Sequence, residues 1–146
     1  MSEHLPSLLE SYARLSVRNM IKTATLSCKC GEVRGSVTNV SRDTVNRIVC
    51  YCDDCQAFLH HLGRAEFLDA QGGTDLVQIA PASLSFMQGT ERIAGLRLSP
   101  NGLYRWYASC CKTPAGRCAS APNLDAPIGV ATHELHDPQG SNRGAD

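Results

Sequence analysis

Cysteine is the residue type with the most reactive chemistry in this sequence, and seven of the eight cysteines lie in three short clusters. A tetrahedral zinc ion holds its sulfur ligands roughly 3.8 Å apart, with Zn–S bonds of about 2.3 Å. Side chains two residues apart on an extended segment point to the same face and can converge on one ion. The clustering therefore predicts metal ligands. The clusters are Cys28 with Cys30, then Cys50, Cys52 and Cys55, then Cys110 with Cys111.

The first and third clusters predict a closed site. Cys28 and Cys30 supply two sulfurs and need partners from far along the chain, which Cys110 and Cys111 offer. Four sulfurs around one ion would tie distant strands together. Structural zinc contributes roughly 10 to 16 kcal/mol to the folding of zinc-finger peptides, so we expect a structural zinc here.

The second cluster predicts a site with an open position. Cys50, Cys52 and Cys55 provide three ligands from one short loop. Three protein ligands and a free fourth position are the usual arrangement of a catalytic zinc. The fourth position would take a water molecule, a substrate thiolate, or the side chain of His60 or His61, which follow the loop.

Other interpretations of clustered thiols have less support. Adjacent cysteines, and cysteines two residues apart, pair poorly as disulfides. Polar and charged residues are spread through residues 1–20, which therefore lack the uninterrupted apolar stretch of a secretion signal. A redox-active set without metal, built on Cys110, Cys111 and Cys118, stays open as an alternative. Cys118 itself lies outside the clusters and is expected to be an ordinary thiol.

Length and composition predict one soluble domain. The chain has 146 residues, 42% of them hydrophobic, which suits a single buried core. Lys plus Arg and Asp plus Glu number 14 each, so no charge excess points to nucleic acid or an anionic membrane as a partner. The apolar runs are far shorter than the roughly 18 residues that span a bilayer. We expect a cytoplasmic protein, in which thiols stay reduced and available to a metal.

The segments between the clusters predict a mainly β domain. The sequence 99–102 (SPNG) predicts a tight turn that joins the last two expected strands into a hairpin. Strands are expected at residues 47–51, 76–80, 84–87, 93–98 and 103–107.

One internal helix is expected over residues 53–62, with Asp53 and Asp54 at its positive end and Gly63 after its last turn. Residues 1–25 are expected to form an extension with a short helix over residues 5–20. Residues 26–136 would form the zinc-binding β domain, and residues 137–146 a disordered tail.

Residues 28–35 (CKCGEVRG) and 50–56 (CYCDDCQ) resemble two motifs of the glutathione-dependent formaldehyde-activating enzyme family, also called the GFA or CENP-V domain. The family patterns are C-x-C-G-x-V and C-x-C-x-x-C followed by Arg or Gln, and the resemblance extends over residues 26–114. It implies a mainly β, Mss4-like β-tent fold with short helices, stabilised by two zinc ions. By matching position, the structural zinc would bind Cys28 and Cys30, and the catalytic zinc Cys50, Cys52 and Cys55.

The third motif of that family, C-x-x-C-G-[ST]-P, is altered in this chain. Here residues 108–114 read ASCCKTP. Aligning Thr113 with the Ser or Thr of the motif places Cys111 on the second cysteine and Ala108 on the first. Cys110 can substitute as the ligand; otherwise three sulfurs and a water would complete the site. The change indicates a divergent bacterial branch of the family.

The resemblance implies a carbon–sulfur lyase of the S-hydroxymethylglutathione synthase type. Such an enzyme acts on a small thiol of the glutathione type and on its adduct with an aldehyde such as formaldehyde. Three thiolates also make a soft, anionic zinc site, which favours exchange of thiolates. The alternative is a non-catalytic zinc-binding module with a protein-interaction or thiol redox role, because a fold does not fix a function. Neither nucleic acid nor a membrane is expected as a partner.

Overall fold

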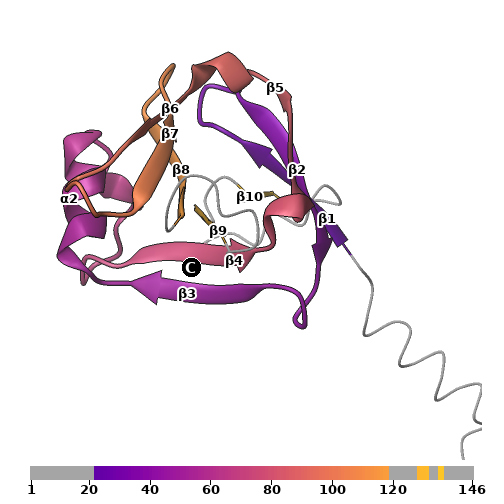
Figure 1. Cartoon of the computed structure of the whole chain (residues 1–146), viewed down its shortest axis with the longest axis horizontal. Coiled ribbons are helices and arrows are strands. Elements are labelled where there is room, and N and C mark those ends of the chain that lie inside the picture. Colours follow the sequence, from indigo (N-terminus) through magenta and orange to yellow (C-terminus); the bar gives the residue numbers. More distant parts are fainter. Residues whose placement is uncertain (1–21, 119–127, 132–134, 137–146) are drawn as a thin grey trace, which may run out of the picture.

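The computed structural model describes residues 22–118, 128–131 and 135–136, which form two antiparallel sheets (Figure 1). The chain is mainly β, as predicted. In Figure 1 the strands surround an interior on three sides, and the helix α2 lies at one outer corner. The predicted helix over residues 5–20 and the predicted tail at 137–146 lie outside the described residues.

The smaller sheet has four strands in the order β10-β1-β2-β5. The strand β1 is antiparallel to β2, with Leu26 opposite Gly35. This sheet already begins at Lys22, within the segment predicted to be an extension. Its strands are β1 (Lys22–Ser27), β2 (Arg34–Val40), β5 (Leu84–Gln88) and β10 (Leu135–His136).

The larger sheet has six strands in the order β3-β4-β9-β8-β7-β6. The predicted hairpin is confirmed, because β6 and β7 pair antiparallel with Ile93 opposite Ala108. Three short 3-10 turns connect the strands, η1 (Ala65–Phe67), η2 (Pro81–Ser83) and η3 (Thr90–Arg92). The six strands are β3 (Asn46–Cys50), β4 (Thr74–Ile79), β6 (Ile93–Leu96), β7 (Tyr104–Ala108), β8 (Thr113–Cys118) and β9 (Ile128–Ala131).

The strand β8 was not predicted, since Pro114 and Gly116 are residues that usually interrupt strands. The position of β8 beside β9 explains why residue 116 is glycine. A Cβ atom on Gly116 would lie 2.2 Å from the carbonyl oxygen of Gly129 on the neighbouring β9. The two backbones approach this closely because no side chain separates them.

The main core lies between the two sheets. Leu26 and Val37 come from the smaller sheet and pack against Ile79 and Val130 of the larger one. All four side chains are at most 2% exposed. Full burial of such a side chain contributes about 1.5 to 3 kcal/mol, so this cluster holds the two sheets together. The three cysteine clusters lie outside it, at strand ends, in loops and in α2.

The helix α2 (Asp53–His61) confirms the predicted internal helix. Cys52 caps it, because the Cys52 sulfur accepts a hydrogen bond from the Cys55 backbone N–H at 3.4 Å. At the other end Gly63 adopts a left-handed conformation, with φ of +67°. The N–H of Gly63 binds the carbonyl of His60, and the next N–H binds the carbonyl of Leu59, which is the usual glycine-ended termination of a helix.

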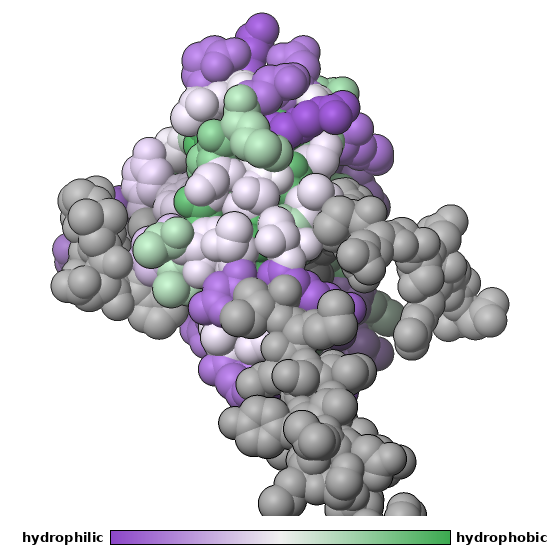
Figure 2. Space-filling model, turned by 90° about the vertical axis from the view of Figure 1, so that its right-hand side faces the viewer, coloured by the Kyte–Doolittle hydropathy of each residue, from purple (hydrophilic) through white to green (hydrophobic). Residues whose placement is uncertain are grey.

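Some large hydrophobic side chains remain exposed on the described part of the chain. Figure 2 shows one face, on which hydrophobic residues lie among pale and hydrophilic ones. None of the helices in the described parts of the chain is long and apolar enough to cross a membrane. The large hydrophobic residues that remain exposed include Val49, Tyr51, Met87 and Leu98.

Candidate metal centres

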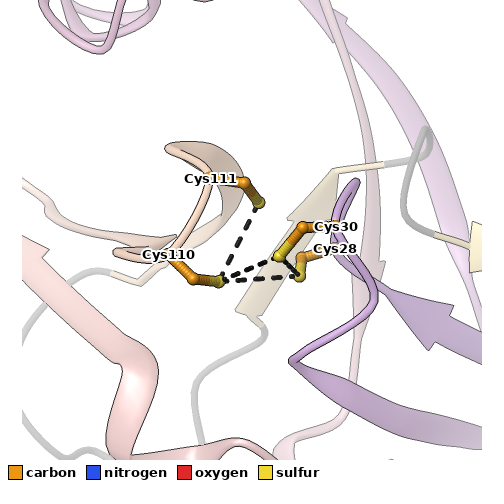
Figure 3. Close-up of side chains that lie close together, drawn as sticks. All are labelled: Cys28, Cys30, Cys110 and Cys111. Atoms are coloured by element: carbon orange, nitrogen blue, oxygen red, sulfur yellow. Dashed lines mark hydrogen bonds between the residues drawn. The ribbon is translucent and has the colours of Figure 1, made fainter.

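Four cysteines from the first and third clusters meet at one point, where the end of β1 approaches the loop between β7 and β8. Figure 3 shows the two pairs, Cys28 with Cys30 and Cys110 with Cys111, directed into the same small space. The Sγ atom of Cys110 lies 3.9 Å from that of Cys28, 3.4 Å from that of Cys30 and 4.0 Å from that of Cys111. All four sulfurs lie within 4.8 Å of one another, so the group can hold a metal ion.

The two loops are shaped to present these sulfurs. In the first loop the Cys28 sulfur accepts the backbone N–H of Val33 at 3.3 Å, and Gly31 turns the chain with φ of +82°. The two loops also contact each other through Thr113, whose hydroxyl accepts the backbone N–H of Lys29 at 3.1 Å and lies 2.8 Å from the Cys111 sulfur. The sequence left the role of Cys110 open, and the structure places Cys110 in the group together with Cys111.

Gly31 provides a test of the first loop. Replacing it by alanine forces an L side chain into the left-handed region, which costs roughly 1 to 2 kcal/mol. We expect Gly31→Ala to lower the free energy of unfolding by about that amount, measured by chemical denaturation of the metal-loaded protein. Gly31→Asn should recover part of the loss, because asparagine tolerates this conformation better. Equal stability of Gly31→Ala and the parent would contradict the assigned conformation.

The second cluster forms a group of three sulfurs at the junction of β3 and α2. The Sγ atom of Cys50 lies 3.4 Å from that of Cys52 and 3.5 Å from that of Cys55. Cys55 is buried, Cys50 is half-buried and Cys52 is exposed. The three sulfurs lie within 4.8 Å of one another and can hold a metal ion, and no fourth ligand joins them among the described residues. His60 and His61 are exposed in the last turn of α2, away from Cys55 in its first turn.

Two arginines adjoin this group. Arg105 on β7 donates from Nη1 to the Cys55 sulfur at 3.5 Å. Arg117 on β8 donates from Nη1 to the same sulfur at 2.9 Å and to the Cys50 sulfur at 3.4 Å. Neither arginine was predicted from the sequence as a site residue. A signal was present in the sequence, since Arg105 interrupts the aromatic run at residues 104–107 (YRWY). The structure shows that Arg105 is only 3% exposed.

The arginines and the backbone change how the thiols ionise. Burial opposes ionisation of Cys50, but hydrogen bonds from the Cys52 backbone and from Arg117 outweigh it and lower the pKa of Cys50 to about 6. Burial raises the pKa of Cys55 to about 12, and a hydrogen bond with Cys52 acts in the same direction. In the metal-free cluster Cys50 therefore loses its proton at a lower pH than Cys55. A bound divalent cation would favour the thiolate form throughout.

The four-sulfur group shows the same asymmetry. Burial opposes ionisation of Cys111, but hydrogen bonds with Thr113 and from the Cys30 backbone lower the pKa of Cys111 to about 6. Burial, together with the thiols of Cys30 and Cys28, raises the pKa of Cys110 above its ordinary value. Closely packed thiols repel each other once they are ionised. A bound cation reduces this repulsion.

One side chain connects the two groups. Arg64 follows the end of α2, and its guanidinium donates to the backbone carbonyl of Cys111, with the Nε atom at 3.1 Å. Its Nη1 atom also lies 3.0 Å from the Glu66 carboxylate. The helix that begins at the three-sulfur group is therefore anchored at its other end to the four-sulfur group. The side chain of the remaining cysteine, Cys118, lies outside the described residues.

The fold and these two groups define a class: mainly β chains with two cysteine clusters that can hold metal ions. Within that class, residues 20–132 match a family of unknown function, DUF6151. The chain therefore belongs to this family, and the matched region contains both clusters.

A similar fold occurs in the crystal structure of a Rhodobacter sphaeroides protein, with a TM-score of 0.52 and 18% sequence identity. The similarity covers 82% of this chain and 91% of that protein. At this sequence identity the likeness concerns the fold alone. No curated protein matches the chain.

Proposed function

We propose that this protein is a zinc-dependent enzyme of the carbon–sulfur lyase type, which acts on a small thiol and its adduct with an aldehyde. The observation that carries the proposal is the difference between the two sulfur groups. One has four sulfurs, and the other has three with no fourth ligand among the described residues. Closed sites are typical of structural zinc, and sites with a free position are typical of catalytic zinc.

Zinc is the proposed metal because both groups consist of thiolates. Soft thiolate ligands select zinc, copper(I) or iron–sulfur clusters, and a four-sulfur tetrahedral group is typical of zinc or iron. The GFA-like motifs at residues 28–35 and 50–56 support zinc and an Mss4-like β-tent arrangement of the two sheets. In this proposal Cys28, Cys30, Cys110 and Cys111 hold the structural ion, and Cys50, Cys52 and Cys55 the catalytic one.

The proposed reaction is addition of a thiol to an aldehyde, or its reverse. In the forward direction a new S–C bond forms, the carbonyl π electrons move to oxygen, and that oxygen gains the proton that the thiol has lost. Bound zinc would lower the pKa of the thiol, so that it is present as the thiolate. Cys52 is exposed, and its side of the group is therefore accessible to a substrate from solvent.

The experiment that tests this proposal joins a metal count to an activity assay. Native mass spectrometry should find two zinc ions per chain, one of which leaves readily when a chelator is added. Formation of the hydroxymethyl thioether from glutathione and formaldehyde, followed by NMR, should be faster with the two-zinc protein than in buffer. The rate should fall to the buffer rate when the labile zinc is removed, and return when zinc is restored.

Two results would contradict the proposal. A protein with a single, tightly held zinc would leave the three-cysteine group without a metal role. A two-zinc protein that gives only the buffer rate with glutathione, and with smaller thiols such as 2-mercaptoethanol, would exclude thiol–aldehyde addition and leave the binding-module alternative.

A further inference from the structure

The two arginines beside the three-cysteine group form an unusual pair. Arg105 and Arg117 lie directly opposite each other on the antiparallel strands β7 and β8. Like charges in this position normally destabilise a sheet. Among the described residues, neither forms an ion pair with a carboxylate, and their guanidinium groups donate to the sulfurs of Cys50 and Cys55. The pair is therefore favourable only when those sulfurs carry negative charge.

Arg105 is the more enclosed of the two. It is 3% exposed, and its guanidinium carbon lies 5.7 Å from the ring centroid of Phe58, a buried residue of α2. A buried cation is costly unless an anion lies beside it. The Cys55 sulfur, 3.5 Å from Nη1 of Arg105, can be that anion when it is a thiolate. A metal ion at the cysteine group favours the thiolate over the thiol, so the metal-loaded state supplies the charge that Arg105 needs.

Arg117 joins two sulfurs that come from different elements. Its Nη1 atom lies 2.9 Å from the sulfur of Cys55 in α2 and 3.4 Å from the sulfur of Cys50 at the end of β3. These two sulfurs are 3.5 Å apart, close to the roughly 3.8 Å between sulfur ligands of one tetrahedral zinc. One donor group shared by both sulfurs keeps them at about this separation.

Cys52, the third cysteine of the group, is held differently. Its side chain is exposed, and its sulfur accepts the backbone N–H of Cys55 as the cap of α2. Within the described part of the chain no arginine donates to it. Two of the three ligands are thus fixed by cations on neighbouring strands, and the third is fixed by the local turn alone.

We infer that Arg105 and Arg117 are positioning residues of the three-cysteine site, which hold the Cys50 and Cys55 sulfurs at ligand spacing and stabilise them as thiolates. This inference rests on the proposed function, since it requires a metal ion at this group. The negative charge of three thiolates exceeds the charge of one divalent ion, and the two guanidinium groups offset the excess. Partners of this kind orient metal ligands, and their loss typically costs 10- to 100-fold in metal affinity.

Substitution by methionine tests the inference, because it removes the charge and the N–H donors and keeps an unbranched side chain. We expect Arg105→Met and Arg117→Met each to weaken binding of the labile zinc about 10- to 100-fold, measured by competition with a chelator. Arg117→Lys should recover part of the loss, because lysine keeps a positive charge and N–H donors. The control is Arg42→Met, the same change at an exposed arginine between β2 and β3, which should leave the affinity unaltered.

The spectrum of the cobalt(II)-loaded protein separates a positioning role from a merely structural one. A hydrogen bond stabilises the lone pairs of a thiolate and so raises the energy of sulfur-to-cobalt charge transfer. The band of the labile ion is the difference between spectra before and after chelator. We expect this band to move to longer wavelength in both methionine variants and to stay in place in Arg42→Met. Arg117 is only half-buried, so Arg117→Met keeps the experiment decisive if Arg105→Met does not fold.

The outcomes distinguish this inference from the proposed function. One metal ion per chain in the parent would overturn both. Two metal ions, with the same zinc affinity and the same band in the parent and in Arg117→Met, would overturn the positioning role alone. A lower melting temperature with an unmoved band would also overturn it, because the arginine would then support only the fold. The expected shifts in a two-metal protein without thiol–aldehyde activity would support the positioning role and overturn the proposed function.

Discussion

Replacing Cys28 by serine is expected to lower the free energy of unfolding by more than about 4 kcal/mol. Losses of this size are exceptional for single substitutions and are typical of the loss of a metal or of a buried network. Cys28 is 3% exposed and lies within 4.8 Å of the other three sulfurs of its group. Metal binding contributes roughly 10 to 16 kcal/mol to the folding of small zinc domains. Denaturant unfolding of the metal-loaded protein and a zinc count on the same sample would measure both losses.

Cys52→Ser is the matched control for that prediction. It makes the same chemical change in the three-cysteine group, at an exposed side chain that caps α2. Serine is itself a favoured helix N-cap, so the cap is kept and we expect a loss of at most about 1 kcal/mol, with the zinc of the four-cysteine group retained. If Cys28→Ser kept both zinc ions and its full stability, the four-cysteine group would not be a structural metal site.

The second large effect concerns activity. Cys55→Ser should reduce zinc-dependent thiol–aldehyde addition by more than about 100-fold, since removal of even an outer partner of a metal ligand typically costs 10- to 100-fold. The Cys55 sulfur accepts hydrogen bonds from both Arg105 and Arg117. Serine holds zinc poorly and gives the arginines a weaker partner. Initial rates with glutathione and formaldehyde, at equal protein concentration, would measure the effect.

The control for that effect is Cys118→Ser, which removes the cysteine outside the three clusters. Its rate should equal that of the parent. A Cys55→Ser protein that retains the parental rate, with its zinc count reduced to one, would show that the activity arises elsewhere. Equal loss in Cys118→Ser and Cys55→Ser would instead favour the thiol redox alternative.

The sequence alone established the local features of this protein. Cys50, Cys52 and Cys55 share one short loop, so their meeting requires only the turn into α2. The helix and the hairpin at Ile93–Leu96 and Tyr104–Ala108 follow from spacing, capping residues and turn residues close together in the chain. Such features depend on residues that are close together in the sequence, so sequence patterns can predict them.

The family motif did not predict that Cys110 lies in the four-cysteine group. The altered sequence ASCCKTP aligned Ala108, not Cys110, with the expected first cysteine. In the structure Ala108 is buried in the core at 2% exposure, and the backbone turns at Lys112 with φ of +59°. This turn allows two adjacent cysteines to enter one group. Only the path of the backbone decides whether neighbouring side chains can converge.

The surroundings of the three-cysteine group were decided by tertiary structure. Arg105 meets Arg117 through the register of β7 and β8, and Thr74 meets Cys50 through the register of β3 and β4. These two strand pairs are separated in the sheet by β9, and they come together around Cys55 only when the whole sheet has formed. A one-residue change in either register would turn these side chains to the opposite face. The sequence thus determined which sulfurs are available, and long-range strand pairing determined which charges surround them.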